Sequence, residues 1–426
     1  MRFLRSPSQP RMMSGKLTRR ATLGSLLGIA ALLGACNPAT FSGSGFGDPN
    51  GAINNSLTAA DPTGEVLGSG TVRVALLTPT SGPGAVGQAG QAIRNAAAMA
   101  LQDYSSADLQ LIVKDVGSGT TAASQQASRA LAEGAQLIIG PLRSDAVKQA
   151  GRVAKPAGVP MIAFSTDTGA AAPGVYLINF SPENDVERIL SYASSQGKRS
   201  MAAMVPTNAY GNVVEAALRQ YASRYGIRVM TIEKYKSGSQ PDPFGLQQAA
   251  EGVAKVKDQI DMVFIPEAAA AVNSAQLLAG QGVRNKNVTF LGTSQWDQAS
   301  ITAEPMLEGA WYPAPPRSLQ NLDGRTIGFQ TFATRYSAQF GSQPPRVASL
   351  AYDSVILAAA LVAQAGERRF SPEILTDPNG FIGFGDGYFR FRADGTSQRS
   401  LAIMQISKGS AQIVDNAPMS VAGLPQ

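Results

Sequence analysis

Histidine is absent from this chain of 426 residues, and cysteine occurs once, as Cys36. The first absence excludes Ser-His-Asp triads, imidazole general bases and His-ligated metals. With Cys36 assigned to another role below, cysteine nucleophiles and zinc–thiolate sites are excluded as well. Carboxylate pairs such as Glu183/Asp185 and Asp258/Asp261 remain, but they lie at expected helix starts and helix–strand junctions, where capping accounts for them. We therefore predict a protein that is not an enzyme and that has no cofactor or metal.

Net charge is also absent once the first 35 residues are set aside. The whole chain has 36 basic and 30 acidic residues, a formal charge of +6. The first 35 residues contain six basic residues and no acidic one, so 30 residues of each sign remain. A neutral remainder lacks the basic surface that attracts nucleic acid. We expect no nucleic-acid partner.

The first 35 residues have the three parts of an export signal. A basic segment ends at Arg19-Arg20, an apolar stretch covers 21–35, and Leu33-Gly34-Ala35 stands directly before Cys36. As a helix, the apolar stretch covers about 22 Å, short of the ~30 Å hydrocarbon core, which disfavours a permanent transmembrane helix. The ending resembles the bacterial lipobox, in which the cysteine is diacylated and becomes the mature N-terminus.

The lipobox resemblance implies a periplasmic protein that is anchored to a membrane through a lipidated Cys36. Asn37 is not the Asp associated with inner-membrane retention in enteric bacteria, which favours the outer membrane. Arg19-Arg20 followed by Ala21 and Thr22 partly resembles a twin-arginine signal, so the export route stays open. Gly, Ser, Asn, Pro and Asp dominate the residues up to Gly70, and we expect 36–70 to be a flexible tether.

From Thr71 onward, short apolar runs alternate with longer amphipathic ones. The short runs are apolar at nearly every position, as strands buried on both faces require; they cover 72–77, 109–113, 135–140, 159–164, 200–205, 227–232, 261–265 and 288–292. Helices are expected between them, several of which end at Gly. The alternation implies right-handed βαβ units. It predicts an α/β fold of two lobes, each a parallel sheet flanked by helices, with several chain crossings between them.

The lobes are expected to be discontinuous in sequence. We assign 71–180 and 314–375 to the first lobe, 181–313 and 376–416 to the second, and 417–426 to a tail. The proline-rich stretch 308–319 interrupts the alternation. Near the end, Asp394-Gly395 joins two β-rich runs and predicts a hairpin.

A glycine-rich loop, "SGPGAVGQAG", follows the first predicted strand. Gly82, Gly84 and Gly87 satisfy G-x-G-x-x-G, the pattern of dinucleotide sites. However, "TPTS" separates the apolar run from Gly82, and Asp115 lies 28 positions after Gly87, where such sites have an acidic residue ~20 positions on. We interpret the loop as the first cleft loop of a binding lobe, with Ser81 and Gly82 as candidate ligand contacts beside a helix N-terminus.

Segments between about Thr71 and Val414 resemble the type I periplasmic binding proteins of the leucine-binding type. They are "VRVALLTPTSGPGAVGQAG", "AQLIIGPLRSDAV", "VPMIAFST", "AYGNVVEAALRQY", "DMVFIPEAAAAV" and "FLGTSQW". The resemblance implies a ligand cleft formed by loops of both lobes. Its candidate contacts, in addition to the first loop, are Ser144, Ser165, Thr166, Tyr210, Glu267, Ser294 and Gln295.

Amino-acid receptors of this fold hold the ligand carboxylate with hydroxyl and N–H groups, here matched by Ser144, Ser165 and Thr166. They hold the ammonium with an acidic residue in the loop aligned to "GTSQWD", where this chain has Ser294. A buried ammonium without a counter-charge is costly. The resemblance therefore favours an amino-acid ligand only if Asp167 or Glu267 supplies the missing charge.

Two of the segments, "LIIGPLRSDAV" and "FSPENDVERI", resemble the penicillin-binding protein activators, lipoproteins that stimulate peptidoglycan synthases from the outer membrane. This resemblance predicts a non-enzymatic regulator of peptidoglycan synthesis with a synthase as its partner. The alternative is the substrate-binding receptor of an ABC importer for amino acids or similar small polar solutes, with an ABC permease as its partner.

Overall fold

The computed structural model describes residues 59–426 apart from 118, 239–241, 317–318, 321–325 and 419–426. The expected signal segment, Cys36 and most of the expected tether lie outside these residues. Each of the strands expected from the apolar runs is present, and two sheets flanked by helices confirm the α/β fold with two lobes.

The first lobe contains a sheet with the order β1-β3-β2-β4-β5-β6. All neighbours are parallel except β1, which is antiparallel to β3. The strands are β1 (Glu65–Leu67), β2 (Val72–Thr78), β3 (Leu109–Asp115), β4 (Leu137–Ile139), β5 (Met161–Ala163) and β6 (Val175–Leu177). Because β1 lies within 36–70, the tether prediction is wrong for its last residues. The ion pair between Glu65 and Arg94 and the ladder with β3 hold this segment against the lobe.

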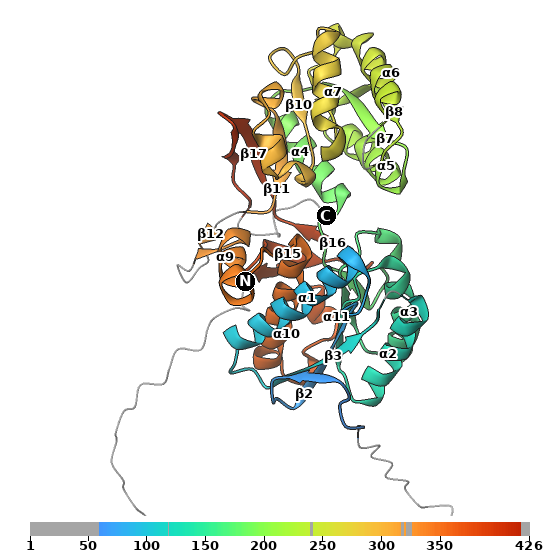
Figure 1. Ribbon diagram of the computed structural model, residues 1–426, viewed down its shortest axis with the longest axis vertical. Coiled ribbons are helices and arrows are strands. Elements are labelled where there is room, and N and C mark those ends of the chain that lie inside the picture. Colours follow the sequence, from blue (N-terminus) through green and yellow to red (C-terminus); the bar gives the residue numbers. More distant parts are fainter. Residues whose placement is uncertain (1–58, 118, 239–241, 317–318, 321–325, 419–426) are drawn as a thin grey trace, which may run out of the picture. The chain divides into compact units, whose positions relative to one another are not determined.

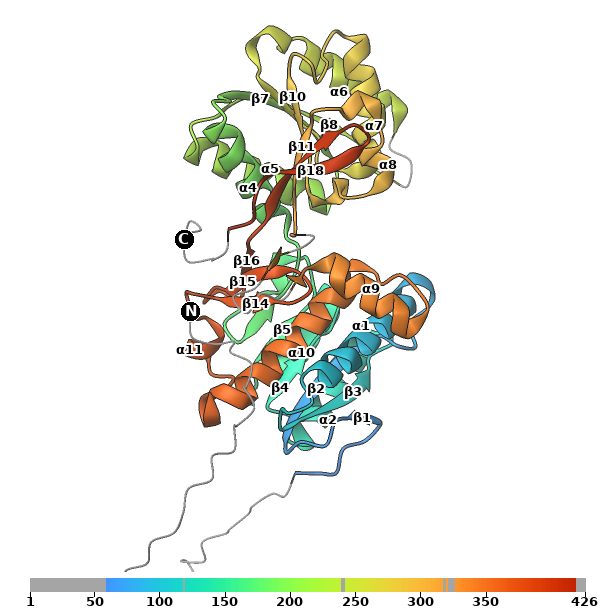
Figure 2. The same ribbon diagram turned by 90° about the vertical axis from the view of Figure 1, so that its left-hand side faces the viewer.

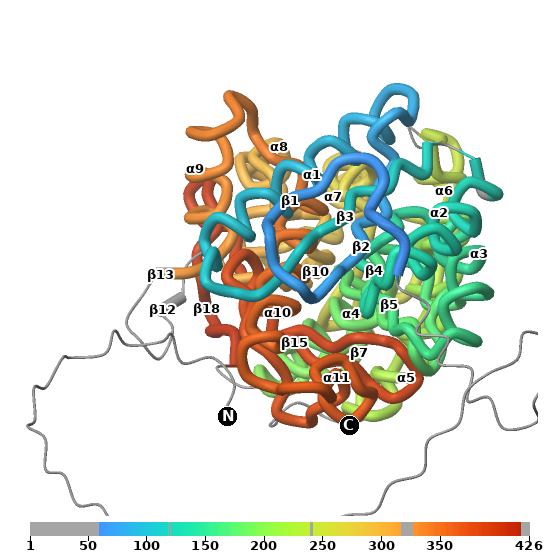
Figure 3. The backbone as a smooth tube through the Cα atoms, turned by 90° about the horizontal axis from the view of Figure 1, so that it is seen from below, coloured from blue at the N-terminus to red at the C-terminus, as the bar shows by residue number. Residues whose placement is uncertain are grey.

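Alternate residues of β2 pack against different helices, as the period of a strand requires. Val74 and Leu76 pack with α1 (Gly84–Asp103) and α10 (Arg346–Gln364), whereas Ala75 and Leu77 pack with α2 (Thr120–Ala132) and α3 (Ser144–Ala154). Figure 3 shows the two helix pairs on opposite sides of the strands. The lobe therefore has three layers, with its sheet buried on both faces.

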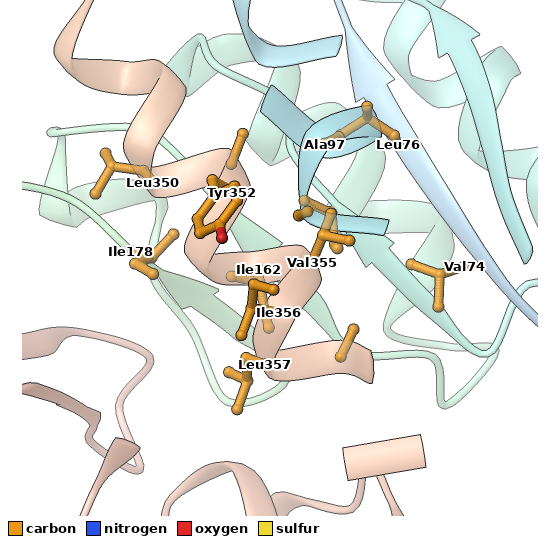
Figure 4. Close-up of a cluster of buried hydrophobic side chains, with 14 of the residues drawn as sticks. Val74, Leu76, Ala97, Ile162, Ile178, Leu350, Tyr352, Val355, Ile356 and Leu357 are labelled. Carbon is orange, nitrogen blue, oxygen red and sulfur yellow. The ribbon is translucent and has the colours of Figure 1, made fainter. Parts of the chain in front are cut away.

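The helix α10 forms the centre of the larger of these two cores. It lies beside α1 in both side views (Figures 1 and 2). Its side chains Tyr352, Val355 and Ile356 belong to the same buried cluster as Leu76 and Ile162 of the sheet (Figure 4). With a mean hydropathy of 1.6 over 18 residues, α10 is long and apolar enough to span a membrane, but 78% of that stretch is buried within the protein. It is therefore a core helix.

The second lobe contains a sheet with the order β18-β17-β11-β10-β9-β7-β8. Its parallel strands are β7 (Ser200–Pro206), β8 (Arg228–Tyr235), β9 (Met262–Phe264), β10 (Thr289–Leu291) and β11 (Trp311–Ala314). The antiparallel strands β17 (Ala402–Ser407) and β18 (Ser410–Asp415) extend it. β11 lies inside the proline-rich stretch 308–319, which therefore contains a strand that the composition of the stretch does not predict.

Helices cover both faces of the second sheet. α4 (Pro182–Ser195) and α5 (Ala209–Arg224) pack on one face, and α6 (Pro243–Ala254) and α7 (Ala268–Gly280) pack on the other. The short α8 (Ala299–Thr302) follows β10. The chain passes between the lobes from β6 to α4, from β11 to α9 (Phe329–Phe340), and from β16 to β17.

A small antiparallel sheet contradicts one predicted boundary. It consists of β14 (Phe381–Gly383), β15 (Gly387–Phe391) and β16 (Ser397–Arg399), and Asp394-Gly395 forms the predicted hairpin turn between the last two. Phe381, Phe389 and Phe391 pack in the first lobe's core, so the assignment of 376–416 to the second lobe is wrong up to β16. The short elements α11 (Pro372–Leu375), β12 (Leu319–Gln320) and β13 (Thr326–Ile327) complete the described chain.

Candidate functional site

Loops and helix starts from both lobes line an open cavity of about 450 Å³. The wall combines apolar side chains with a few polar and charged ones, which is typical of small-molecule sites. Its lining residues are Thr166, Asp167, Phe180, Pro182, Asp185, Ala209, Tyr210, Val213, Ser294, Gln295, Asp297, Pro315 and Arg346. Among the described residues, no group of three or more His, Cys, Asp or Glu side chains is placed to hold a metal ion.

Four of the predicted cleft residues line this cavity: Thr166, Tyr210, Ser294 and Gln295. Tyr210 lies in the first turn of α5, where its hydroxyl is 3.2 Å from Thr293 Oγ1 and 3.4 Å from the Pro266 carbonyl oxygen. Burial raises the pKa of the Tyr210 hydroxyl far above its ordinary value, so this group stays protonated.

The other five predicted residues are not among the lining residues, because each is engaged elsewhere. The Ser81 N–H donates to Asp115 Oδ1 at 3.2 Å, and the Gly82 N–H closes a turn onto the Pro79 carbonyl at 3.0 Å. Glu267 accepts hydrogen bonds from the Tyr235 hydroxyl at 3.0 Å and from Ser237 Oγ at 2.6 Å. Glu267 is therefore bound within the second lobe and does not supply the counter-charge to the cavity.

Two of the three predicted carboxylate-binding hydroxyls are engaged by Asp167, Ser144 by its carboxylate and Ser165 by its backbone N–H, whereas Thr166 lines the cavity. Ser144 Oγ donates to Asp167 Oδ2, and Lys148 Nζ lies 3.1 Å from the same oxygen. Ser165 is buried, and its Oγ accepts the Asp167 N–H at 3.1 Å. The hydrogen bond from Ser144 and the ammonium of Lys148 hold the pKa of Asp167 below its usual range. A ligand carboxylate in this place would meet an ionised aspartate.

Asp185 is the acidic side chain that stands closest to the expected ammonium site, and the sequence analysis attributed it to helix capping. It lies in the first turn of α4 and is 4% exposed. Its Oδ2 accepts hydrogen bonds from Ser294 Oγ at 2.7 Å and from the Ser294 N–H at 2.9 Å. The loop after β10 has Ser294 where amino-acid receptors have an acidic residue, and α4 supplies a carboxyl group beside Ser294 instead.

The environment of Asp185 differs from that of Asp167, because no cation pairs with it in the described part of the chain. Burial, which outweighs the two hydrogen bonds from Ser294, raises the pKa of Asp185 to about 7. Its second oxygen, Oδ1, accepts no hydrogen bond from a described residue. Asp185 therefore presents an unsatisfied acceptor at the cavity wall.

Other lining residues were also missed by sequence reasoning, among them two charged side chains and one aromatic ring. Arg346 begins α10, Phe180 lies just before α4, and Asp297, which accepts a hydrogen bond from the Tyr312 hydroxyl at 3.1 Å, follows the short turn after β10. Asp297 lies in the loop "GTSQWD" after the predicted strand 288–292, but Arg346 and Phe180 do not follow one of the predicted strands. The pairing of Asp185 with Ser294 joins positions 109 residues apart, which no local sequence pattern reveals.

Residues 71–411 match the family profile described as periplasmic binding protein. A search of curated proteins finds no significant match. Similar solved structures include a branched-chain amino acid ABC transporter protein from Rhodospirillum rubrum, at 17% identity and a TM-score of 0.68, covering 80% of this chain and 99% of that one. A leucine-binding protein from Thermotoga maritima has 18% identity and a TM-score of 0.57, covering 82% and 99%. A solute-binding protein from R. palustris in complex with benzoate has 18% identity and a TM-score of 0.56, covering 83% and 98%.

Proposed function

The chain belongs to the periplasmic binding protein family, and from that premise we propose that it is a solute receptor that binds a small polar ligand in the cavity and delivers it to an ABC permease. Members of this family work outside the cytoplasm. The solved structures that resemble the chain are mostly substrate-binding proteins of ABC transporters, which bind ligands without converting them. This supports the receptor over the regulator of peptidoglycan synthesis.

The observation that carries the proposal is the buried carboxyl of Asp185 at the cavity wall. A buried carboxylate is costly unless it is paired, and within the described residues Asp185 has only the Ser294 hydroxyl and N–H as partners. A ligand amine placed against Oδ1 would supply the missing charge. The apolar side chains of Val213, Ala209 and Pro315 would surround the rest of the ligand. We therefore expect a small amine of the amino-acid type.

A thermal-shift screen of the 20 amino acids, small amines and small carboxylates tests the receptor role. A ligand at 100 times its Kd should stabilise the protein by ~2.7 kcal/mol. Because an amine ligand requires ionised Asp185, its affinity should fall about tenfold for each pH unit below about 7. D185N should remove this pH dependence and weaken binding, whereas the exposed-site variant D258N should change neither. A flat screen would contradict the proposal.

We also propose that Cys36 is lipidated and anchors the receptor, because it is the chain's only cysteine and follows an export-type segment. Metabolic labelling with a fatty-acid probe should label the full chain, and C36S should lose the label and leave the membrane fraction. The regulatory role and the outer-membrane location stay predictions. A pull-down with peptidoglycan synthases tests the first, and sucrose-gradient fractionation of the membranes tests the second.

A further inference from the structure

Among the described residues, Arg346 at the start of α10 is the cation that lines the cavity wall. Its buried Nη2 lies 2.9 Å from Asp386 Oδ1. Its Nη1 and Nε donate no hydrogen bond to a described residue, and 34% of the side chain is exposed. Since a guanidinium has five N–H donors in a fixed plane, Arg346 retains unused donors that are accessible from the cavity.

Aromatic rings fix the orientation of this guanidinium. Its carbon lies 3.9 Å from the ring centroid of Phe329 and 4.8 Å from that of Phe180. The guanidinium of Arg399 lies 4.8 Å from the same Phe180 ring and 5.4 Å from Phe389. In each such contact the face of the ring attracts the cation. Arg346 is therefore held in one position by a continuous series of rings and guanidinium groups.

The charges behind Arg346 do not cancel its positive charge completely. Arg346 and Arg399 face Asp386 and Asp353, both of which are almost fully buried. Burial, together with the neighbouring Asp386 carboxylate, raises the pKa of Asp353 well above its usual range. With one proton on this carboxyl pair, two guanidinium groups face one negative charge. This cluster of four side chains then carries a net positive charge, and Arg346 is its member at the cavity wall.

The alternative anchor for a ligand carboxylate is already occupied. Asp167 engages Ser144 and Lys148, and it would repel a second carboxylate there. Asp185, on the second lobe, carries the other sign of charge.

From this geometry we infer that Arg346 is the anion anchor of the cavity, and that it binds a carboxylate of the ligand through Nη1 and Nε. The ligand class is a small organic acid, with its amine at Asp185 where it has one. This inference rests on the proposed function. It assigns the carboxylate to a guanidinium from the start of α10, where the sequence predicted the hydroxyls of Ser144, Ser165 and Thr166.

Matched acid and amide probes test this anchor by titration calorimetry. The pairs are L-leucine and L-leucinamide, L-phenylalanine and L-phenylalaninamide, and benzoate and benzamide. In each pair of which one member binds, the acid should bind at least tenfold more tightly than the amide. R346Q should remove that preference, R346K should retain part of it, and the exposed-site control R284Q should leave it unchanged.

Because R346Q leaves Asp386 without its cation, the double variant R346Q/D386N is measured in parallel and should lose the preference in the same way. Equal binding of acid and amide, or a preference that survives in both variants, would overturn the anchor. If none of the six probes binds while the broader screen finds a ligand without a carboxylate, the anchor fails and the receptor stands. If both screens are flat, both proposals fail.

Discussion

Asp386 in the first lobe and Asp185 in the second are both buried carboxyl groups, but they have different partners. In the first lobe, Asp386 is paired with Arg346 at 2.9 Å, and Asp353 accepts the N–H groups of Gly385 and Asp386 at 2.7 and 3.1 Å. In the second lobe, the partners of Asp185 among the described residues are the hydroxyl and N–H of Ser294. The first arrangement balances most of its charge internally. The second leaves a negative charge that a ligand can neutralise.

Asp386 is therefore expected to contribute to the stability of the fold, and Asp185 to the binding of a ligand. A carboxylate that completes an internal ion pair is expected to stabilise the fold, because its removal strands a buried cation. A buried carboxylate without a cation is expected to destabilise the unliganded fold wherever it is ionised. Variants of each group should therefore affect unfolding with opposite signs, and this difference can be tested at a single pH.

The largest effect is expected for Asp386→Ala. It removes the carboxylate beside Arg346. Within this cluster, Asp353 is then the remaining carboxyl group that can balance the two guanidinium groups of Arg346 and Arg399. The free energy of unfolding should fall by about 3–5 kcal/mol, measured by urea denaturation at pH 7. Glu367→Gln, an exposed site on the same lobe, is the matched control and should stay within about 0.5 kcal/mol of the parent. A loss below 1 kcal/mol for D386A would show that the first lobe is not stabilised by this pair.

A smaller effect, with the opposite sign, is expected for Asp185→Asn. The pKa of Asp185 is about 7 in the fold and near its model value of 3.8 in the unfolded chain, so its contribution to stability is complete below about pH 4 and is lost as the pH rises through 7. Relative to the parent, D185N should gain about 1.4 kcal/mol for each unit between pH 5 and 7 and level off above 8. Urea denaturation of both proteins at pH 5, 6, 7 and 8 measures this. Parallel pH curves would show that Asp185 does not titrate as described.

Much of the fold could be predicted from the sequence, because strands buried on both faces are apolar at nearly every position. β2, β7 and β9 are examples whose residues are almost all buried. The prediction was wrong where composition and packing disagree. β11 contains Pro313, yet it lies between β10 and β17 in the second sheet. β14 to β16 were assigned to the second lobe, but they pack in the core of the first lobe together with α10.

The candidate site was less predictable, since its charged members depend on long-range packing. Thr166, Tyr210 and Ser294 lie in the loop or the first helical turn after β5, β7 and β10, which is why the loop rule found them. Asp185 and Arg346 lie in the first turns of helices, where an acidic or basic residue has a local explanation. Only the meeting of α4 with the loop after β10, and of α10 with the loop after β14, reveals their partners.

The smallest effect is expected for Ser294→Ala, which removes the Oγ donor from Asp185 and keeps the backbone N–H donor. A hydrogen bond to a charged group contributes about 1.5–3 kcal/mol, and one to a neutral group about half as much. The loss should therefore be larger at pH 8, where Asp185 is ionised, than at pH 5, and the pKa of Asp185 should rise above about 7. Urea denaturation at the two pH values measures the difference, with the exposed Ser300→Ala as control. In the D185N background the pH dependence of the Ser294 effect should vanish, since no titrating partner is left. If it persisted there, Ser294 would act on another group, and the contrast between the two lobes would not rest on Asp185.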